Sequence, residues 1–299
     1  MQSAFQRIYA LVSADRRRSA VLAVAACLPL AGCSGLEGVT SPFSGLFGGE
    51  KYQTKLLKDT PADQLYDTGL VRLQKHDYDG AGKDFGELEK QYPNSNWSQK
   101  GLLMQTYSQY TEGKYDDAVA TANHYIGLYP SAKDTPYVYY LAGMSYYNQI
   151  PEADKDQERA EKALIVFSQL VEKFPKSEYV ADAKYKIQVA KDQLAGREMK
   201  VGRFYLQSAN YTAAINRFRE VLAKYQSTRH TEEALYRLVE AYLKLGVVNE
   251  AQTAAAVLGH NFPDSQWYKD AYALLKTGNL EPQESQDSWI SKAFRKTVG

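Results

Sequence analysis

Cysteine is scarce in this chain. Only two of its 299 residues are cysteine, Cys27 and Cys33, and both lie near the amino terminus. The sequence after Cys33 therefore holds neither a disulfide nor a thiolate metal site. Its fold must be stabilised by packing alone.

Charge of one sign and the patterns typical of enzymes are also missing. Lysine and arginine total 36 against 35 for aspartate and glutamate, a formal net charge of +1. The absence of excess cations argues against nucleic acid as a partner. No His-Glu-x-x-His helix, phosphate-binding glycine loop or nucleophile elbow is present, and the four histidines are far apart: His76, His124, His230 and His260. We expect no catalytic residue, no metal, no cofactor and no enzymatic activity.

The amino-terminal 32 residues have the features of a bacterial secretion signal. Three arginines at 16–18 precede an apolar run at 20–30, which is shorter than the roughly 20 residues that cross a bilayer. The run ends in Leu30-Ala31-Gly32-Cys33, which resembles a lipobox. We predict a signal peptide at 1–32, lipidation of Cys33, and a flexible tether rich in glycine and serine over 33–60. The alternative is an ordinary secreted protein with a chance cysteine.

Ser34 follows the predicted lipidated cysteine. By resemblance to sorted lipoproteins, a residue other than aspartate at this position favours the outer membrane. We therefore expect a chain anchored by lipid to the periplasmic face of the outer membrane.

An aromatic residue followed by proline recurs along the chain, with a serine close behind. Proline ends a helix and serine can cap the next one, so each occurrence predicts a boundary between helical pairs. At the fourth boundary glutamine replaces the proline. The five boundaries are Tyr92-Pro93, Tyr129-Pro130, Phe174-Pro175, Tyr225-Gln226 and Phe262-Pro263, followed by Ser95, Ser131, Ser177, Ser227 and Ser265.

A second pattern lies upstream of these boundaries. The segments that share it are Tyr78-x-x-Ala81-x-x-x-Phe85, Tyr115-x-x-Ala118-x-x-x-Ala122 and Tyr211-x-x-Ala214-x-x-x-Phe218, and Ala163-x-x-x-Phe167 and Ala251-x-x-x-Ala255 keep its second half. The pattern resembles the tetratricopeptide repeat, in which a small residue lets paired helices approach closely. We predict an all-α fold, a right-handed α-solenoid of about five tetratricopeptide-like helix pairs over 61–278 that ends in a capping helix.

The repeat spacing locates the irregular parts of the array. Successive boundaries lie 37 positions apart except for 45 between Pro130 and Pro175 and 51 between Pro175 and Gln226. The first excess predicts an insertion around 151–156, between the helices of the third pair. The second predicts a long first helix from about Glu178 to Gln207. The capping helix is expected from Trp267 to Leu275.

The first helix of each pair is expected to line the concave face. Tyrosine is abundant, with 24 copies, and a stripe of it falls on this face, which we interpret as a groove for peptide segments. The alternative is that the stripe is core, although Leu65, Leu102 and Tyr146 already occupy the core phase. The predicted groove residues are Tyr66, Leu70, Tyr107, Tyr110, Tyr137, Tyr140, Met144 and Tyr147, and Leu73 and Leu103 share their face.

The later pairs carry a more charged version of this face. Met199, Arg203, Tyr236 and Glu240 take the equivalent positions, and we predict that Arg203, Tyr236 and Glu240 bind a partner. The tail at 279–299 has an amphipathic pattern in which Ser288 caps a short helix with Trp289 and Phe294 on one face. That helix is expected to bind a partner, to pack on the chain's own last repeats, or to be disordered.

Together these features resemble the BamD family, also called ComL or YfiO, of outer-membrane barrel-assembly lipoproteins. The more specific matches are 137–143, the charged insertion before Arg159-Ala160, 174–179 and 191–195. Gln226 and the tail depart from the family pattern.

The resemblance implies a periplasmic scaffold that binds the POTRA domains of BamA through its later repeats and unfolded outer-membrane β-barrel proteins through its earlier ones. It also implies contacts with other Bam lipoproteins and with the membrane through the lipid anchor. The alternative is a different tetratricopeptide lipoprotein that acts as an adaptor for cell-wall or division proteins.

Overall fold

The computed structural model describes residues 60–152 and 155–295, which belong to one compact unit, Leu56–Gly299. The predicted signal peptide, the lipidation at Cys33 and the tether lie outside the described residues. The described residues form twelve α-helices and no strand. The predicted all-α class is confirmed.

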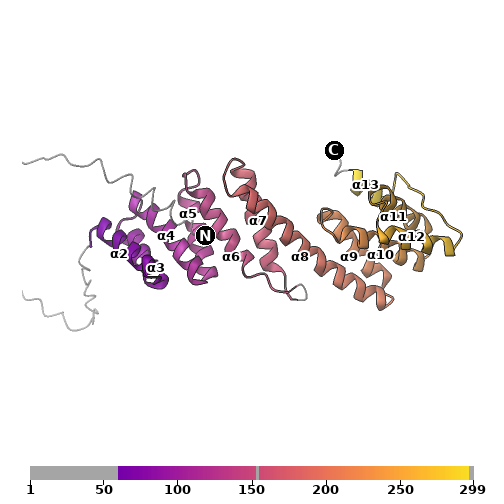
Figure 1. Cartoon of the computed structure of the whole chain (residues 1–299), viewed down its shortest axis with the longest axis horizontal. Helices are drawn as coiled ribbons and strands as arrows, with labels where there is room; N and C mark the ends of the chain where they lie inside the picture. Colours follow the sequence, from indigo (N-terminus) through magenta and orange to yellow (C-terminus); the bar gives the residue numbers. More distant parts are fainter. Residues whose placement is uncertain (1–59, 153–154, 296–299) are drawn as a thin grey trace, which may run out of the picture. The chain divides into compact units, whose positions relative to one another are not determined.

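Ten of the helices form five successive pairs, in which each helix packs against the next along the chain (Figure 1). This is the predicted number of tetratricopeptide-like pairs. The pairs are α2 (Ala62–Gln74) with α3 (Tyr78–Gln91), α4 (Asn96–Glu112) with α5 (Tyr115–Leu128), α6 (Thr135–Tyr147) with α7 (Glu158–Lys173), α8 (Val180–Gln207) with α9 (Tyr211–Lys224), and α10 (Thr231–Lys244) with α11 (Val248–Asn261).

Two further helices follow the pairs. The predicted capping helix is α12, Gln266–Thr277, which packs on α10 and α11. The short helix α13, Trp289–Arg295, packs on α9 and α11. None of the helices in residues 60–152 and 155–295 combines the length and the apolar character needed to cross a membrane.

Every predicted boundary ends a second helix at its aromatic residue. Tyr92, Tyr129, Phe174, Tyr225 and Phe262 are the carboxyl-terminal caps of α3, α5, α7, α9 and α11. At the four boundaries that have proline, it disfavours the helical conformation for the residue before it, so the helix stops there. The helix α9 ends at Tyr225 without a proline. The boundary prediction is confirmed.

The serine caps are confirmed at only two boundaries. Ser95 accepts a hydrogen bond from the Ser98 amide, and Ser265 accepts one from the Trp267 amide. The prediction is wrong for the other three serines because a longer turn follows them, and the next helix begins only at Thr135, Val180 or Thr231. The residues that precede these helices make no capping bond through their side chains.

The core repeats one packing unit. The alanine expected at each close approach is fully buried in all five pairs: Ala81, Ala118, Ala163, Ala214 and Ala251. The first helix adds a glycine that faces the phenylalanine of the second helix in three pairs. A Cβ built on Gly143 would lie 2.5 Å from the Phe167 ring, and one on Gly202 would lie 2.4 Å from Phe218. The ring therefore fills the space that the glycine leaves open.

The remaining two pairs fill this contact the other way round, with the larger residue on the first helix and the smaller one on the second. Where the second helix carries Ala122 or Ala255 instead of phenylalanine, the equivalent position of the first helix carries Thr106 or Val239. All four side chains are buried. A larger residue on the first helix thus compensates for the smaller one on the second.

The long helix α8 serves two pairs. Near its start, Ala183 and Ile187 pack with residues of α6 and α7, whereas Leu194, Ala195 and Met199 pack with residues of α9 and α10. The helix runs unbroken through Gly196 and Gly202. Its predicted length is confirmed, and so is the insertion, which lies between the end of α6 and the start of α7.

Candidate functional site

Five tyrosines from successive repeats gather on one side of the first helices. Their rings lie close together: Tyr179 is 5.3 Å from Tyr137 and 5.1 Å from Tyr140 between ring centroids, and the second pair is stacked at 28°. The hydroxyls of Tyr107 and Tyr110 lie near enough to Tyr137 to influence its pKa. We call these residues the tyrosine cluster: Tyr107 and Tyr110 on α4, Tyr137 and Tyr140 on α6, and Tyr179 at the start of α8.

Polar partners fix the orientation of two rings in the cluster. The Tyr140 hydroxyl donates to Asp182 Oδ2 at 2.8 Å. The Asn148 amide donates to the Tyr110 hydroxyl at 3.2 Å and to Tyr115 at 3.4 Å. The cluster is therefore held in place by hydrogen bonds as well as by ring contacts.

The tyrosine hydroxyls are neutral at physiological pH. Burial raises the pKa of Tyr107, Tyr110, Tyr137 and Tyr140, and Asp182 raises that of Tyr140 further through its hydrogen bond. All four side chains are half-buried. The cluster thus presents an uncharged surface in which apolar rings alternate with hydroxyls that can donate or accept hydrogen bonds.

The predicted groove residues Met144 and Tyr147 lie on the same helix as Tyr140 and are half-buried. The Lys186 ammonium lies 4.7 Å from the centroid of the Tyr147 ring and 5.5 Å from that of Tyr185. Tyr185 is 62% exposed. Leu70 is half-buried on α2, a helix with no member in the cluster.

Tyr66 was expected in the groove, and the structure contradicts this. Its side chain is only 4% exposed, and its ring packs 5.5 Å from Phe85 and 5.6 Å from Trp97. Burial raises its pKa to about 12. Leu73 is buried too, whereas Leu65, which we expected in the core, is half-buried. The predicted phase of the first helix is wrong because the large Tyr66 ring fills the contact with the second pair.

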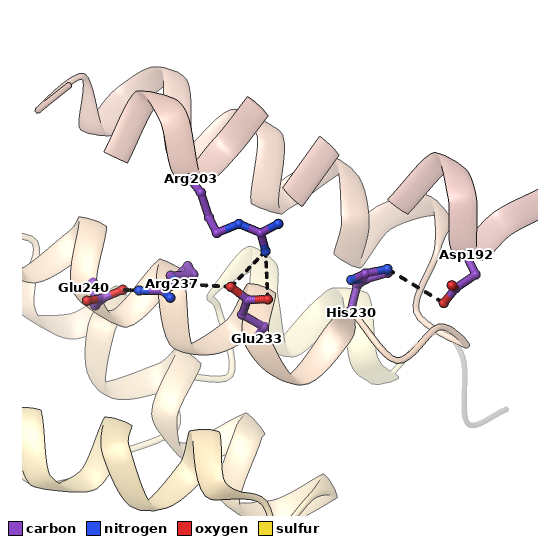
Figure 2. A network of polar contacts seen from close by, with 6 residues as sticks. All are labelled: Asp192, Arg203, His230, Glu233, Arg237 and Glu240. Atoms are coloured by element: carbon purple, nitrogen blue, oxygen red, sulfur yellow. Dashed lines mark hydrogen bonds and ion pairs between the residues drawn. The ribbon is translucent and has the colours of Figure 1, made fainter. Parts of the chain in front are cut away.

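The later repeats carry a polar network on the same helix series. Arg203 on α8 binds both oxygens of Glu233 on α10 at 3.0 and 2.9 Å. Arg237 joins Glu233 at 3.3 Å to Glu240 at 2.6 Å. Figure 2 shows this chain of ion pairs beside a separate contact, where His230 Nε2 lies 3.8 Å from Asp192. We call these six residues the α8–α10 polar network.

The two other residues of the charged face differ in position. Tyr236 is half-buried and its ring lies 5.3 Å from Trp267, with the Arg237 guanidinium over both rings. Met199 was expected on the same face but is fully buried. It belongs to the core between α8 and α9, so it cannot contact a partner.

Comparison with known proteins decides the family. The family model of YfiO, described as an outer membrane lipoprotein, matches residues 58–258. The outer membrane protein assembly factor BamD of Caulobacter vibrioides is 41% identical over 244 residues, which cover 82% of this chain and 80% of that protein. BamD of Rickettsia prowazekii is 43% identical over 216 residues, 72% of this chain and 86% of its own.

The chain belongs to the BamD (YfiO) family. Proteins of this family assemble other proteins and are not enzymes, which agrees with the absence of catalytic patterns in the sequence. Within the described residues of this BamD-family chain, no group of three or more histidine, cysteine or acidic side chains is placed to hold a metal ion.

Sequence reasoning missed one residue of the tyrosine cluster in this BamD-family chain, Tyr179, and the two polar partners of the cluster, Asp182 and Asn148. Tyr179, Asp182 and Asn148 lie at helix ends or in the connecting segment, where helical periodicity gives no phase. The only available signal was their position in the sequence relative to a repeat boundary. Residues just after a boundary lie beside the first helix of the preceding pair, because the pairs stack.

The tail helix packs on the chain's own repeats, which was one of the three alternatives. Ile290 is fully buried, and the Trp289 indole donates to the Tyr242 hydroxyl at 2.9 Å. Trp289 and Phe294 pack against the core of the later repeats. Their assignment as partner-binding residues is therefore replaced by an intramolecular role, because the apolar face of α13 is already covered.

Proposed function

We propose that this chain is a lipid-anchored scaffold on the periplasmic face of the outer membrane, within the machinery that assembles β-barrel proteins. Family membership and the printed function of its relatives support this role. In the proposal, Cys33 carries the anchor, the tyrosine cluster binds unfolded barrel precursors, and the later repeats bind BamA, with contacts to other Bam lipoproteins.

The tyrosine cluster is the observation that carries the substrate part of this proposal. An unfolded barrel strand presents apolar side chains in alternation with an unpaired backbone. Half-buried tyrosine rings offer apolar contact at low entropic cost, and their neutral hydroxyls can bind backbone groups. Such a surface accepts many sequences of one chemical type. The residues that we assign to it are Tyr107, Tyr110, Tyr137, Tyr140, Met144 and Tyr147, together with Leu70 of α2.

The charged face of the later repeats suits a folded partner. Arg203, Tyr236 and Glu240 lie there with part of each side chain accessible to solvent. The ion pairs of Arg203 and Glu240 can be exchanged for pairs with a partner, which gives specificity more than affinity. We assign this face to the POTRA domains of BamA.

Site-specific cross-linking tests the substrate site. A photoreactive peptide with the sequence of a barrel strand is added to the purified chain, and the cross-linked fraction is measured. Replacing Tyr107 and Tyr140 with alanine removes two rings and is expected to lower the yield by roughly tenfold, equivalent to about 1.4 kcal/mol of binding free energy. The phenylalanine variants keep the rings, so the remaining loss measures the hydroxyls.

Tyr272→Ala is the matched control, because Tyr272 is exposed on α12. It should cross-link as the unmodified chain does. Recovery of BamA in a pull-down should stay unchanged in all variants. An unchanged yield for the double alanine variant would reject the tyrosine cluster as the substrate site. A simultaneous loss of BamA recovery would indicate misfolding.

A further inference from the structure

The segment between α12 and α13 runs along α11. The Gln283 amide donates to the Gln252 carbonyl at 3.3 Å, and the Gln252 side chain donates to the Glu281 carbonyl at 2.8 Å. Two residues further along the tail, the Ser285 amide donates to the Thr253 hydroxyl at 3.2 Å. The backbone of the tail is therefore held on α11 before α13 begins.

The helix α13 then sits on α9 and α11. Ser288 caps it by accepting from the Ile290 amide at 3.1 Å, and the same hydroxyl donates to Glu250 on α11 at 2.5 Å. The Trp289 ring lies under the Arg219 guanidinium of α9, 4.9 Å from the ring centroid. Ile290 is fully buried. The first turn of α13 is therefore held by apolar, polar and cationic contacts together.

Gln226 holds the other end of α13. Its side-chain amide donates to the Ala293 carbonyl at 3.2 Å. Carbonyls in the last turn of a helix need partners from outside it, and a proline at this position has no side chain that could supply one. The one boundary without proline is thus the boundary that contacts the tail.

The backbone before Gln226 differs from that at the other boundaries. The residue before each proline has ψ of 56°, 57°, 58° or 61°, whereas Tyr225 has ψ of 31°. Proline forbids the more helical values for its predecessor. Without it, the chain turns differently into the segment that carries the Gln226 amide.

We propose that the groove between α9 and α11 is a helix-docking site for the chain's own segment Ser288–Phe294, and that Gln226 is its specificity-determining residue. The two departures from the repeat pattern are then related, because the glutamine at the fourth boundary binds the tail helix. A seven-residue helix is marginal alone, so the groove supplies its stability and recognises the sequence by its first turn and its last carbonyls.

Hydrogen exchange in the full chain tests the role of Gln226. In Gln226→Ala, and in Gln226→Pro, the amides of α13 are expected to exchange roughly 2- to 10-fold faster, the effect of one lost hydrogen bond. Gln188→Ala is the matched control, because its amide donates to the Ser227 carbonyl at 2.8 Å in the same loop without touching the tail. Exchange of α13 that is unchanged in the Gln226 variants, or equally fast in the control, would overturn the assignment.

Binding of the tail in trans tests the groove. The full chain carrying Ile290→Asp should release its own tail, because a carboxylate replaces a fully buried side chain. A fluorescein-labelled peptide of residues 281–295 is expected to bind this variant at least tenfold more tightly than the unmodified chain, whose own tail competes at millimolar effective concentration. The same peptide with Trp289→Ala should bind weakly.

Circular dichroism of the Ile290→Asp chain establishes that the repeats stay folded, and Trp289→Ala in the full chain provides a second recipient, with a weakened tail and an intact Gln226. Equal peptide binding to the opened and unmodified chains would refute a specific groove. Absence of binding to both opened variants would do the same.

Discussion

At the scale of single residues, the repeats depend on pairs of complementary volume. Glycine opposes phenylalanine at Gly69, Gly143 and Gly202, and a larger first-helix residue opposes alanine in the other two pairs. The alanine positions could be read from the sequence because they recur in phase. The opposing glycines were less evident, since the distance between partners changes where the loop of the third pair is longer.

Gly143→Ala is expected to destabilise the fold by about 1–3 kcal/mol, because the new methyl overlaps the Phe167 ring. Gly82→Ala, on the second helix α3, is the control, because a Cβ there would lie 3.6 Å from Ser108, an ordinary contact. It should stabilise the chain by about 0.5–1 kcal/mol through helix propensity. Thermal and urea unfolding measure both, and equal effects of the two substitutions would contradict this account of the packing.

At the scale of helices, α8 and α10 meet through polar side chains. The His230 ring packs against Gly196, which has no side chain; a Cβ built on Gly196 would lie 3.3 Å from His230 Nε2. Asp192 from α8 and Arg229, Glu233 and Arg203 surround it. Desolvation lowers the pKa of His230, and Asp192 offsets part of that effect. The imidazole is therefore neutral in the folded chain at neutral pH.

This lowered pKa gives a pH dependence of known sign. The unfolded chain binds a proton at His230 near pH 6.5, before the folded chain does. The stability contributed by the neutral ring is therefore complete above about pH 6.5 and is lost as the pH falls toward the lower pKa of the folded state. His230→Gln should flatten this part of the stability profile measured by urea unfolding, whereas the same change at exposed His260 should not. A profile that keeps its slope in His230→Gln would exclude His230 as the source.

At the scale of the whole chain, the two proposed binding surfaces belong to a body that we propose is held by one lipid anchor. We predict that Cys33→Ser yields a folded protein that fractionates as soluble periplasmic material, since Cys33 is the only acylation site proposed. Membrane fractionation with a salt wash measures this, and circular dichroism provides the control for folding. A variant that stays in the outer membrane fraction after the wash would show that another anchor or protein contacts suffice.

The sequence by itself determined the helical class, the number of pairs, the boundaries and the length of α8. These features follow from local rules, because proline, glycine and the period of small residues act within one or two turns of the chain. The family also followed from sequence, through motifs and their order.

Only the tertiary structure decided which tyrosines are exposed and where the tail goes. Tyr66 and Tyr140 each lie three residues before the glycine that faces the phenylalanine of the second helix. Tyr140 is half-buried, but Tyr66 is buried by Phe85 and Trp97 from neighbouring helices. The site on which α13 packs likewise combines Gln226, Glu250 and Tyr242, which come from three parts of the chain. Burial and docking depend on residues that are distant in sequence, and one helix's periodicity contains no information about its neighbours.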